Sequence, residues 1–505
     1  MNQSKHVVVG ATISMMTLIL QMLAAFVKVR VILIHYGHEY YSIFQSSNGI
    51  FSYLILIESG FSVAYLLKMY EPYAKKNYKH LQALYVGLEK MLTKVASIML
   101  MGVIAITVFY PMVIADNSLG RLELSLLIGL CGIKFVLPYF FTVAKKQMLN
   151  VVEKSYLTSI IDSFINLITD IIIIAIAYFT NWSFLIIVLA QVLMLIPSII
   201  VYSVIISYYK KSFSFEKKIV PSYEPSAMTK DIMAQKIAYL ADNNIDQIIL
   251  STRDLLQTTV YTSFNSVVSY PVSMINQLIA SFRGHLGVRL ADNVNDSYSL
   301  FRRLLSVNYY IASVISCVFV FQVQDFIRLW IGETYSTQDV TVILFSLLLF
   351  RKCAENTVTI AREGRDLYKE SKNYAIMAAF VNLVLSLILV QFFEIKGLVI
   401  ATLVADLFVL DFNNYRLVFR KIFNKSIDIW KELTPFLICF VCVCYLKYNT
   451  SLGNTENLTW TYFISKSFIV FLLTAFSICA LYMLCSDHFR KTISQVLPSR
   501  LKKKN

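Results

Sequence analysis

The chain has 505 residues, of which 57% are hydrophobic and 15% are charged. A soluble domain carries roughly a quarter charged residues, so this composition excludes an ordinary water-soluble fold. The formal net charge is +15, but no basic stretch outside the apolar runs is interleaved with aromatic residues, which argues against a nucleic-acid-binding protein. The composition therefore predicts an all-α, polytopic membrane protein.

Apolar runs of about 18 to 25 residues recur along the whole chain, and each is long enough to cross a bilayer as a helix. The first run is too long for a signal-peptide core and has no cleavage site after it, so we count it as a span. The runs and their polar flanks predict fourteen transmembrane helices, at 8–34, 41–67, 91–115, 122–145, 157–179, 183–208, 232–252, 256–281, 304–323, 340–360, 374–392, 397–420, 432–448 and 460–485.

Lysine and arginine are concentrated in alternate loops and in the C-terminal tail, which ends on Lys502, Lys503 and Lys504. Because cytoplasmic loops of membrane proteins carry the excess of basic residues, this alternation predicts that both termini are cytoplasmic. The external connections are short, and none is long enough for an external domain. The orientation follows only if all fourteen spans are counted correctly.

A polar linker containing Pro221 and Pro225 follows the sixth span and divides the chain. We expect an N-lobe at 1–208 (spans one to six), a cytoplasmic linker at 209–231 and a C-lobe at 232–420 (spans seven to twelve). Spans thirteen and fourteen occupy 421–485, and a basic cytoplasmic tail occupies 486–505. A weak repeat supports two six-helix lobes of one topology, because a shift of 217 positions aligns Phe44 with Tyr261 and Asn48 with Asn265.

Polar and acidic side chains recur inside several predicted spans. An ionisable side chain at the centre of a bilayer costs roughly 3 kcal/mol or more, so such residues are functional candidates by default. Their spacing of three to four residues in spans five and seven forms a polar stripe on one helix face. The candidates are Glu58, Asp162, Asn166, Asp170, Asp242, Asp246 and Asn265.

Cations also occur within or at the ends of the predicted spans, where they are suited to hold an anionic head group. They are Lys28, Arg30, Lys134, Arg253, Arg351 and Lys352. The alternative is that each cation snorkels to the membrane surface or forms a buried ion pair for packing alone. In that case Lys134 and Arg351 have carboxylate partners, drawn from Glu58, Asp162 and Asp406. Both interpretations stay open at the level of the sequence.

No catalytic or metal-binding motif stands out. The six histidines lie at span ends or in loops, and the eight cysteines all fall within apolar runs. Cys439-x-x-Cys442 has neither a second cysteine pair nor a histidine partner, so it does not predict a zinc or redox site. We therefore expect no metal, no cofactor and no enzymatic activity.

Several short motifs, spread over nearly the whole chain, resemble the polysaccharide transporter family of bacterial flippases. This family belongs to the same superfamily as the multidrug and toxic-compound extrusion (MATE) proteins. The motifs are Arg30-x-x-Leu33-x-x-x-Gly37-x-x-Tyr40-Tyr41, Leu56-Ile57-Glu58-Ser59-Gly60-Phe61, Asp242-x-x-x-Asp246-x-x-Ile249-Leu250-Ser251, Phe326-Ile327-x-Leu329-Trp330-Ile331-Gly332 and Asn382-Leu383-Val384-Leu385-Ser386.

The resemblance implies a flippase in the bacterial inner membrane that moves an undecaprenyl-diphosphate-linked oligosaccharide repeat unit to the outer face by alternating access. Its product would feed capsule, O-antigen or exopolysaccharide assembly, with a polymerase as a partner beside membrane lipids. The six cations would bind the diphosphate, and the acidic and amide residues would line the sugar path or couple a proton or sodium ion. Spans thirteen and fourteen would hold the lipid tail, in which case Lys466 needs a polar partner.

Two other functions compete with this one. A cation-coupled multidrug exporter of the same fold explains the acidic stripes better than the basic residues. A membrane-embedded polysaccharide polymerase or acyltransferase typically needs a sizeable external loop or an intramembrane histidine, and the sequence predicts neither.

Overall fold

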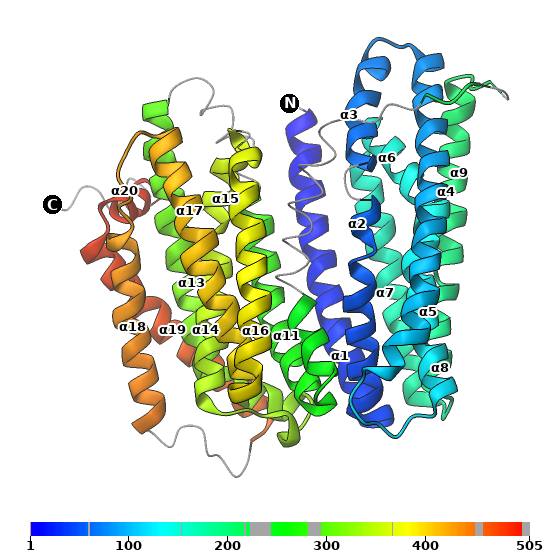
Figure 1. Cartoon of the computed structure of the whole chain (residues 1–505). Coiled ribbons are helices and arrows are strands. Elements are labelled where there is room, and N and C mark those ends of the chain that lie inside the picture. Colours follow the sequence, from blue (N-terminus) through cyan, green and yellow to red (C-terminus); the bar gives the residue numbers. More distant parts are fainter. Residues whose placement is uncertain are drawn as a thin grey trace. The chain divides into compact units, whose positions relative to one another are not determined.

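The computed structural model describes residues 2–58, 61–152, 154–216, 219–222, 244–280, 294–365, 367–449 and 458–496. The described residues are helical or irregular, with no strand among them. The chain divides into two units, Met1–Thr259 and Val260–Asn505, which we describe separately (Figure 1). Residues 223–243 include most of the predicted seventh span and lie outside the described part, so the predicted lobe and linker boundaries stay predictions.

The first unit consists of a long bent helix followed by shorter ones. Its elements are α1 (Asn2–Ser52), α2 (Ile55–Glu58), α3 (Phe61–Ala74), α4 (Tyr78–Phe109), η1 (Tyr110–Met112), α5 (Arg121–Phe141), α6 (Val143–Val151), α7 (Ser155–Phe179), α8 (Phe184–Leu193) and α9 (Leu195–Ser212). A further helical stretch covers residues 244–251.

The second unit contains most of α11 (Leu255–Ala280) and all the later elements. These are α13 (Val294–Trp330), η2 (Glu333–Tyr335), α14 (Asp339–Ala354), α15 (Asn356–Gly364), α16 (Tyr368–Val404), η3 (Ala405–Asp411), α17 (Phe412–Arg416), η4 (Leu417–Ile422), α18 (Trp430–Asn449), α19 (Trp460–Cys485) and α20 (Asp487–Val496). Two of the short elements, η3 and η4, are π-helical.

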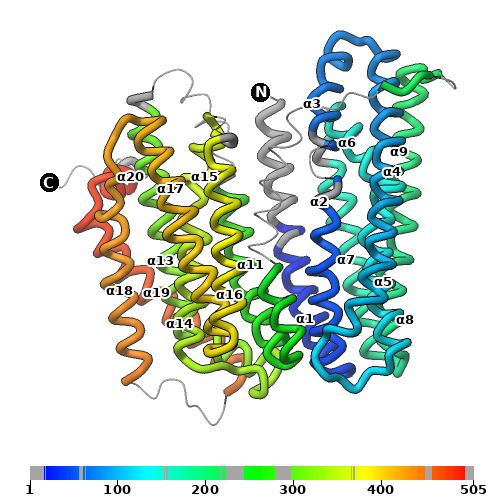
Figure 2. The backbone as a smooth tube through the Cα atoms, viewed as in Figure 1, coloured from blue at the N-terminus to red at the C-terminus, as the bar shows by residue number. Residues whose placement is uncertain are grey.

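Two chain reversals fall inside elements that are otherwise continuous. Gly37 interrupts α1 with φ 83° and ψ 178°, a conformation that only glycine adopts without strain. Glu394 interrupts α16 with φ 52° and ψ −130°, and a side chain at nearby Gly397 would collide with the carbonyl of Leu389. Within α1 and within α16 the chain turns back on itself, as Figure 2 shows. The reversals coincide with the predicted turns between spans one and two and between spans eleven and twelve.

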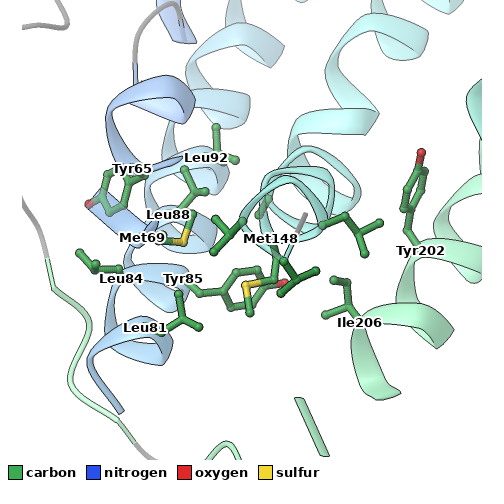
Figure 3. Packing of buried hydrophobic residues seen from close by; sticks show 14 residues of the cluster. Tyr65, Met69, Leu81, Leu84, Tyr85, Leu88, Leu92, Met148, Tyr202 and Ile206 are labelled. Atoms are coloured by element: carbon green, nitrogen blue, oxygen red, sulfur yellow. The ribbon is translucent and has the colours of Figure 1, made fainter. Parts of the chain in front are cut away.

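The core of the first unit lies where α3, α4, α6 and α9 meet (Figure 3). Tyr85 and Met148 are almost fully buried there, together with Tyr202 and Ile206 from α9. The first half of α4 contributes its face at Leu81, Leu84, Tyr85, Leu88 and Leu92, which follows a helical spacing of three and four residues. This amphipathic stretch precedes the predicted span at 91–115, so α4 begins earlier than its hydropathy predicted.

The helix α13 organises the second unit, because α14, α18, α19 and α20 all pack against it. Ion pairs hold the C-terminal pair α18–α19 to α13 near both of its ends. Arg302 Nη2 lies 3.1 Å from Glu432 Oε1 of α18, and Lys466 Nζ of α19 lies 2.7 Å from Asp325 Oδ2. Lys466 thus has the polar partner that the sequence required of it.

The helix α20 lies within the segment that the sequence assigned to a basic tail. Its Phe489 is 1% exposed and packs against Tyr310 and Tyr482, with ring centroids 5.1 and 5.4 Å away. The start of the tail is therefore an ordered amphipathic helix, which the search for long apolar runs did not detect.

Eight helical stretches in the described part of the chain are long and apolar enough to cross a membrane. Two of them, Ile19–Ser52 and Glu370–Ile422, contain the reversals at Gly37 and Glu394. Three predicted spans, at 256–281, 340–360 and 432–448, coincide with α11, α14–α15 and α18, which are outside this set of eight. The protein is therefore an all-α, multi-pass membrane protein, as the sequence predicted.

Candidate substrate-binding sites

The predicted cation Lys28 and the predicted acid Asp170 meet where α1 packs against α7. Lys28 Nζ lies 2.6 Å from Asp170 Oδ1, and the two side chains are 24% and 13% exposed. A second bond joins the same two helices, from Gln21 Nε2 to the carbonyl of Ser163 at 2.9 Å. The packing of α1 on α7 therefore fixes Lys28 in place while part of its surface stays accessible.

Lys134 on α5 lies in the same region and has a neutral partner. Its Nζ donates a hydrogen bond to Gln191 Oε1 of α8 at 2.7 Å and lies 5.5 Å from the centre of the Phe44 ring. It is also within electrostatic reach of Lys28 and Asp170. The carboxylate partners considered for Lys134, Glu58 and Asp162, have other contacts.

We call Lys28, Lys134, Asp170 and Gln191 the basic cluster. It contains two ammonium groups and one carboxylate, so one positive charge is left uncompensated within it. Arg30 is half-buried two residues beyond Lys28 on α1. Sequence reasoning missed Gln191, since a single glutamine in an apolar run gives no signal until its neighbour is known.

Asp162, about two turns before Asp170 on α7, forms a separate contact. Its Oδ2 lies 2.7 Å from Lys146 Nζ, and its Oδ1 accepts a hydrogen bond from the Tyr202 hydroxyl at 2.8 Å. The Lys146 ammonium also lies 5.3 Å from the centre of the Tyr202 ring. Asn166, between the two acids on α7, is exposed. The sequence analysis singled out neither Lys146 nor Tyr202.

The other predicted acidic and amide residues are scattered. Glu58 is 4% exposed, and its Oε1 accepts a hydrogen bond from the backbone N–H of Ser62 at 3.0 Å, which caps the first turn of α3. Asp246 is buried in the helical stretch 244–251, and Asn265 is half-buried on α11. Asp242 lies outside the described residues.

Arg253 borders an open cavity of about 500 Å³ in the first unit, together with His38, Glu39, Asp116 and Asp254. Glu39 Oε2 accepts two hydrogen bonds from Ser118, one from the backbone N–H at 3.0 Å and one from the hydroxyl at 2.5 Å. The lining thus has more carboxylates than cations. Arg253 is exposed and lies away from the contacts of the basic cluster.

Arg351 is the most heavily paired of the predicted cations, at 5% exposure. Its Nε and Nη2 each lie 2.8 Å from an oxygen of Asp411, in a two-pronged contact, and its Nη1 lies 2.6 Å from Asp406 Oδ2. Glu355 adds a third carboxylate at 3.0 Å. We call these four residues the acidic cluster. Lys352, the adjacent predicted cation, is half-buried on α14.

The π-helical turn explains how Asp406 and Asp411 reach one guanidinium. In an α-helix, residues five apart point about 140° away from each other, because each residue turns the helix by 100°. In a π-helix the hydrogen bonds join residues five apart, so such residues stack on one face. The element η3 (Ala405–Asp411) thereby presents both aspartates to Arg351. The sequence suggested Asp406 as a packing partner but gave no sign of Asp411.

No protein-family model matches the sequence, and no curated protein matches it. Solved structures do match the fold. The lipid II flippase MurJ, in an inward closed conformation, matches with a TM-score of 0.66 and 14% identity, over 96% of this chain and 99% of that one. An inward-facing multidrug resistance MATE family transporter matches with a TM-score of 0.58 and 13% identity, over 85% and 96%.

A second MATE multidrug transporter, DinF-BH, matches with a TM-score of 0.56 and 12% identity, over 82% of this chain and 96% of that one. At these identities the likeness establishes the fold alone. The chain thus has the fold that the lipid flippase MurJ and the MATE multidrug transporters share, carried by a multi-pass membrane protein.

Proposed function

We propose that this protein is a flippase that moves an undecaprenyl-diphosphate-linked oligosaccharide repeat unit from the cytoplasmic to the outer face of a bacterial inner membrane by alternating access. Both termini lie in the cytoplasm, and the repeat unit enters capsule, O-antigen or exopolysaccharide assembly, where a polymerase consumes it. The protein makes and breaks no covalent bond and uses no cofactor. The coupling ion is a proton or a sodium ion.

The observation that carries the proposal is the basic cluster. A diphosphate diester carries two negative charges, and it is stable at membrane depth only beside cations and hydrogen-bond donors. Lys28 and Lys134 are held by neighbouring helices, are within electrostatic reach of each other and share a single carboxylate. An anion that binds there completes the charge balance of the cluster.

The extent of the structural match also favours a lipid-linked cargo. The helices α18 and α19 have 20 and 26 residues, so an alignment with the lipid II flippase over 96% of the chain must include much of this pair. The matches to the MATE transporters cover 85% and 82% of the chain. Large apolar side chains on α19, such as Ile464, Phe468 and Phe476, are exposed and suit a lipid tail.

We do not include Arg351 in the diphosphate site. Its guanidinium already bonds to three carboxylates, and a phosphate would have to displace them while leaving their charges buried. The proposed set is therefore Lys28 of α1 and Lys134 of α5, and the part of Arg30 in the site stays a prediction from the sequence. The sugars bind to hydroxyl and amide groups such as Asn166, which α7 presents on the same helix as Asp170.

The acidic cluster favours a second candidate, a cation-coupled multidrug exporter. Three carboxylates gather around one guanidinium there, and a concentration of carboxylates suits a cationic drug or a coupling cation. This candidate predicts that transport depends on carboxylates rather than on the basic cluster.

The two candidates are separated by reconstituting the purified protein in liposomes and measuring the appearance of an undecaprenyl-diphosphate-linked sugar on the opposite leaflet. We expect the Lys28→Gln, Lys134→Gln double variant to lose transport by about a hundredfold or more, because each of the two lost charge-assisted bonds contributes about 1.5 to 3 kcal/mol. The matched control is Lys145→Gln, since Lys145 of α6 donates a hydrogen bond to Ser203 Oγ of α9 at 2.6 Å, outside the basic cluster.

The proposal fails if the double variant transports the lipid-linked sugar at the wild-type rate. It also fails if neither protein moves that lipid while both accumulate a cationic dye, which would support the exporter. The amount of protein and its thermal unfolding midpoint in detergent have to match the wild type, so that loss of transport is not loss of fold.

A further inference from the structure

A second basic site lies in the second unit, Val260–Asn505, and contains none of the candidate site residues described above. Its cavity of about 350 Å³ is lined by Tyr374 of α16 and by Asn413, Arg416, Leu417, Arg420 and Lys421 of α17 and η4. The start of α16 and the end of η4 form its two walls. Lys421 Nζ lies 2.5 Å from Glu370 Oε1, an ion pair that holds these walls together.

The lining has an excess of positive charge. It contains three cations, and Lys421 is balanced by Glu370. Among the described residues, no carboxylate lies within ion-pair distance of Arg416 or Arg420, and both side chains are exposed. Two guanidinium groups four positions apart, each able to bond two oxygens of one phosphate, are suited to a phosphate ligand.

The same helices present large apolar side chains beside the basic cavity. Phe412 and Phe408 precede Arg416 along the chain and are 56% and 72% exposed, and Phe380 of α16 is 65% exposed. In a multi-pass membrane protein, exposed phenylalanines of this size contact acyl chains. Basic and apolar surfaces therefore adjoin, which matches a ligand with a charged head and a hydrocarbon tail.

We propose that this cavity is a binding site for the phosphodiester head group of an anionic phospholipid in the cytoplasmic leaflet. The predicted topology places the start of span eleven and the end of span twelve on the cytoplasmic side, where the surface potential of the bilayer is negative. Basic pockets between transmembrane helices at this side are typical sites for anionic head groups. The site does not depend on the proposed cargo, because its residues are separate from the basic cluster.

The test is a titration of the purified full-length protein with dioleoyl phosphatidylglycerol and with dioleoyl phosphatidylcholine, followed by native mass spectrometry. We expect the wild type to prefer phosphatidylglycerol. The Arg416→Gln, Arg420→Gln variant should lose affinity for it on the order of thirtyfold, as expected for two basic residues near an anionic lipid surface. Its affinity for phosphatidylcholine should stay unchanged.

Two control variants make the test specific. Arg416→Lys with Arg420→Lys keeps both charges and should retain most of the affinity. Arg365→Gln with Lys425→Gln removes two exposed charges from the same unit, outside the cavity, and should bind phosphatidylglycerol about as tightly as the wild type. If the glutamine variant unfolds in detergent, the salt dependence of lipid binding to the wild type replaces it as the test. Added salt must then weaken the binding of phosphatidylglycerol more than the binding of phosphatidylcholine.

Three results would overturn the assignment. One is equal phosphatidylglycerol affinity in the wild type and the glutamine variant. Another is a parallel loss for both lipids, which would make the contact apolar rather than a phosphate contact. The third is displacement of phosphatidylglycerol from the wild type, but not from the variant, by low concentrations of farnesyl diphosphate, which would reassign the cavity to a lipid-linked diphosphate.

Discussion

The basic cluster and the acidic cluster are both built from charges inside a membrane protein, but they differ in burial and balance. In the first, Lys28 and Lys134 are half-buried and share one carboxylate, with Gln191 as a neutral partner. In the second, Arg351 is buried and bonds to three carboxylates at 2.6 to 3.0 Å.

The two clusters differ in what their charges can do. The lysines of the basic cluster are available to a ligand, whereas the charge of Arg351 is used in helix packing. A buried guanidinium with all its bonds made stabilises the helices around it, and breaking one side of such an arrangement is costly. A partly buried lysine with a neutral partner has no carboxylate to neutralise it, so its charge is available to a ligand. Sequence alone gave Arg351 and Lys134 the same role, and their contacts distinguish them.

The largest effect is expected at Arg351. Arg351→Gln leaves two buried carboxylates and the partly exposed Glu355 around a neutral amide, and we expect a loss of about 3 to 5 kcal/mol in the free energy of unfolding. Chemical denaturation of the purified protein in detergent measures this loss. Combining Arg351→Met with Asp406→Asn and Asp411→Asn should recover most of it, because the triple variant neutralises the two buried carboxylates and leaves only Glu355, which is 19% exposed. A stable but inactive Arg351→Gln protein would instead place Arg351 in the transport site.

An intermediate effect, of opposite sign for the two proposed cargoes, is expected at Asp170. Asp170→Asn frees Lys28 from its carboxylate, so the affinity for undecaprenyl diphosphate should rise about twofold to fivefold, as for removal of one partly exposed charge. Binding is measured by native mass spectrometry, with Asp162→Asn as the control because Asp162 pairs with Lys146. Loss of binding of a cationic dye in Asp170→Asn, with no gain for the diphosphate, would favour the exporter.

The smallest effect is expected at Lys75, whose exposed ion pair is the reference against which the two clusters are compared. Lys75 and Glu71 form an ion pair of 2.6 Å on α3, but their side chains are 71% and 73% exposed. Solvent screens such a pair, and Lys75→Gln should leave both the unfolding midpoint and transport unchanged. A measurable loss of either would mean that short ion pairs in this protein matter irrespective of burial, and the distinction between the two clusters would weaken.

Hydropathy predicted the apolar parts of the helices well and the amphipathic parts poorly. The predicted span at 460–485 coincides with α19, which is apolar along most of its length. In contrast, α4 and α13 extend beyond the predicted spans that they contain, and α20 was missed altogether. These stretches bury one face against other helices and expose a polar one, so their mean hydropathy is low even though their helical periodicity is regular.

The candidate residues could be chosen from the sequence, but their partners could not. A charge in an apolar run is visible without a structure, and Lys28, Lys134, Asp170 and Arg351 were all selected in this way. The partner of Lys28 lies 142 positions away, and the two-pronged contact of Arg351 with Asp411 depends on a π-helical turn that shifts the register of α16 and η3. Neither long-range packing nor a local change of helix type has a signature in the spacing of residues.

The sequence by itself determined that this chain is an all-α membrane protein, where most of its helices lie and which charges fall within apolar stretches. These follow from the cost of placing polar groups in hydrocarbon, which acts on each segment separately. Only the tertiary structure decided which of those charges are neutralised, because pairing depends on helices that are distant in the chain packing side by side. It left the cations of α1 and α5 in excess and surrounded Arg351 of α14 with carboxylates.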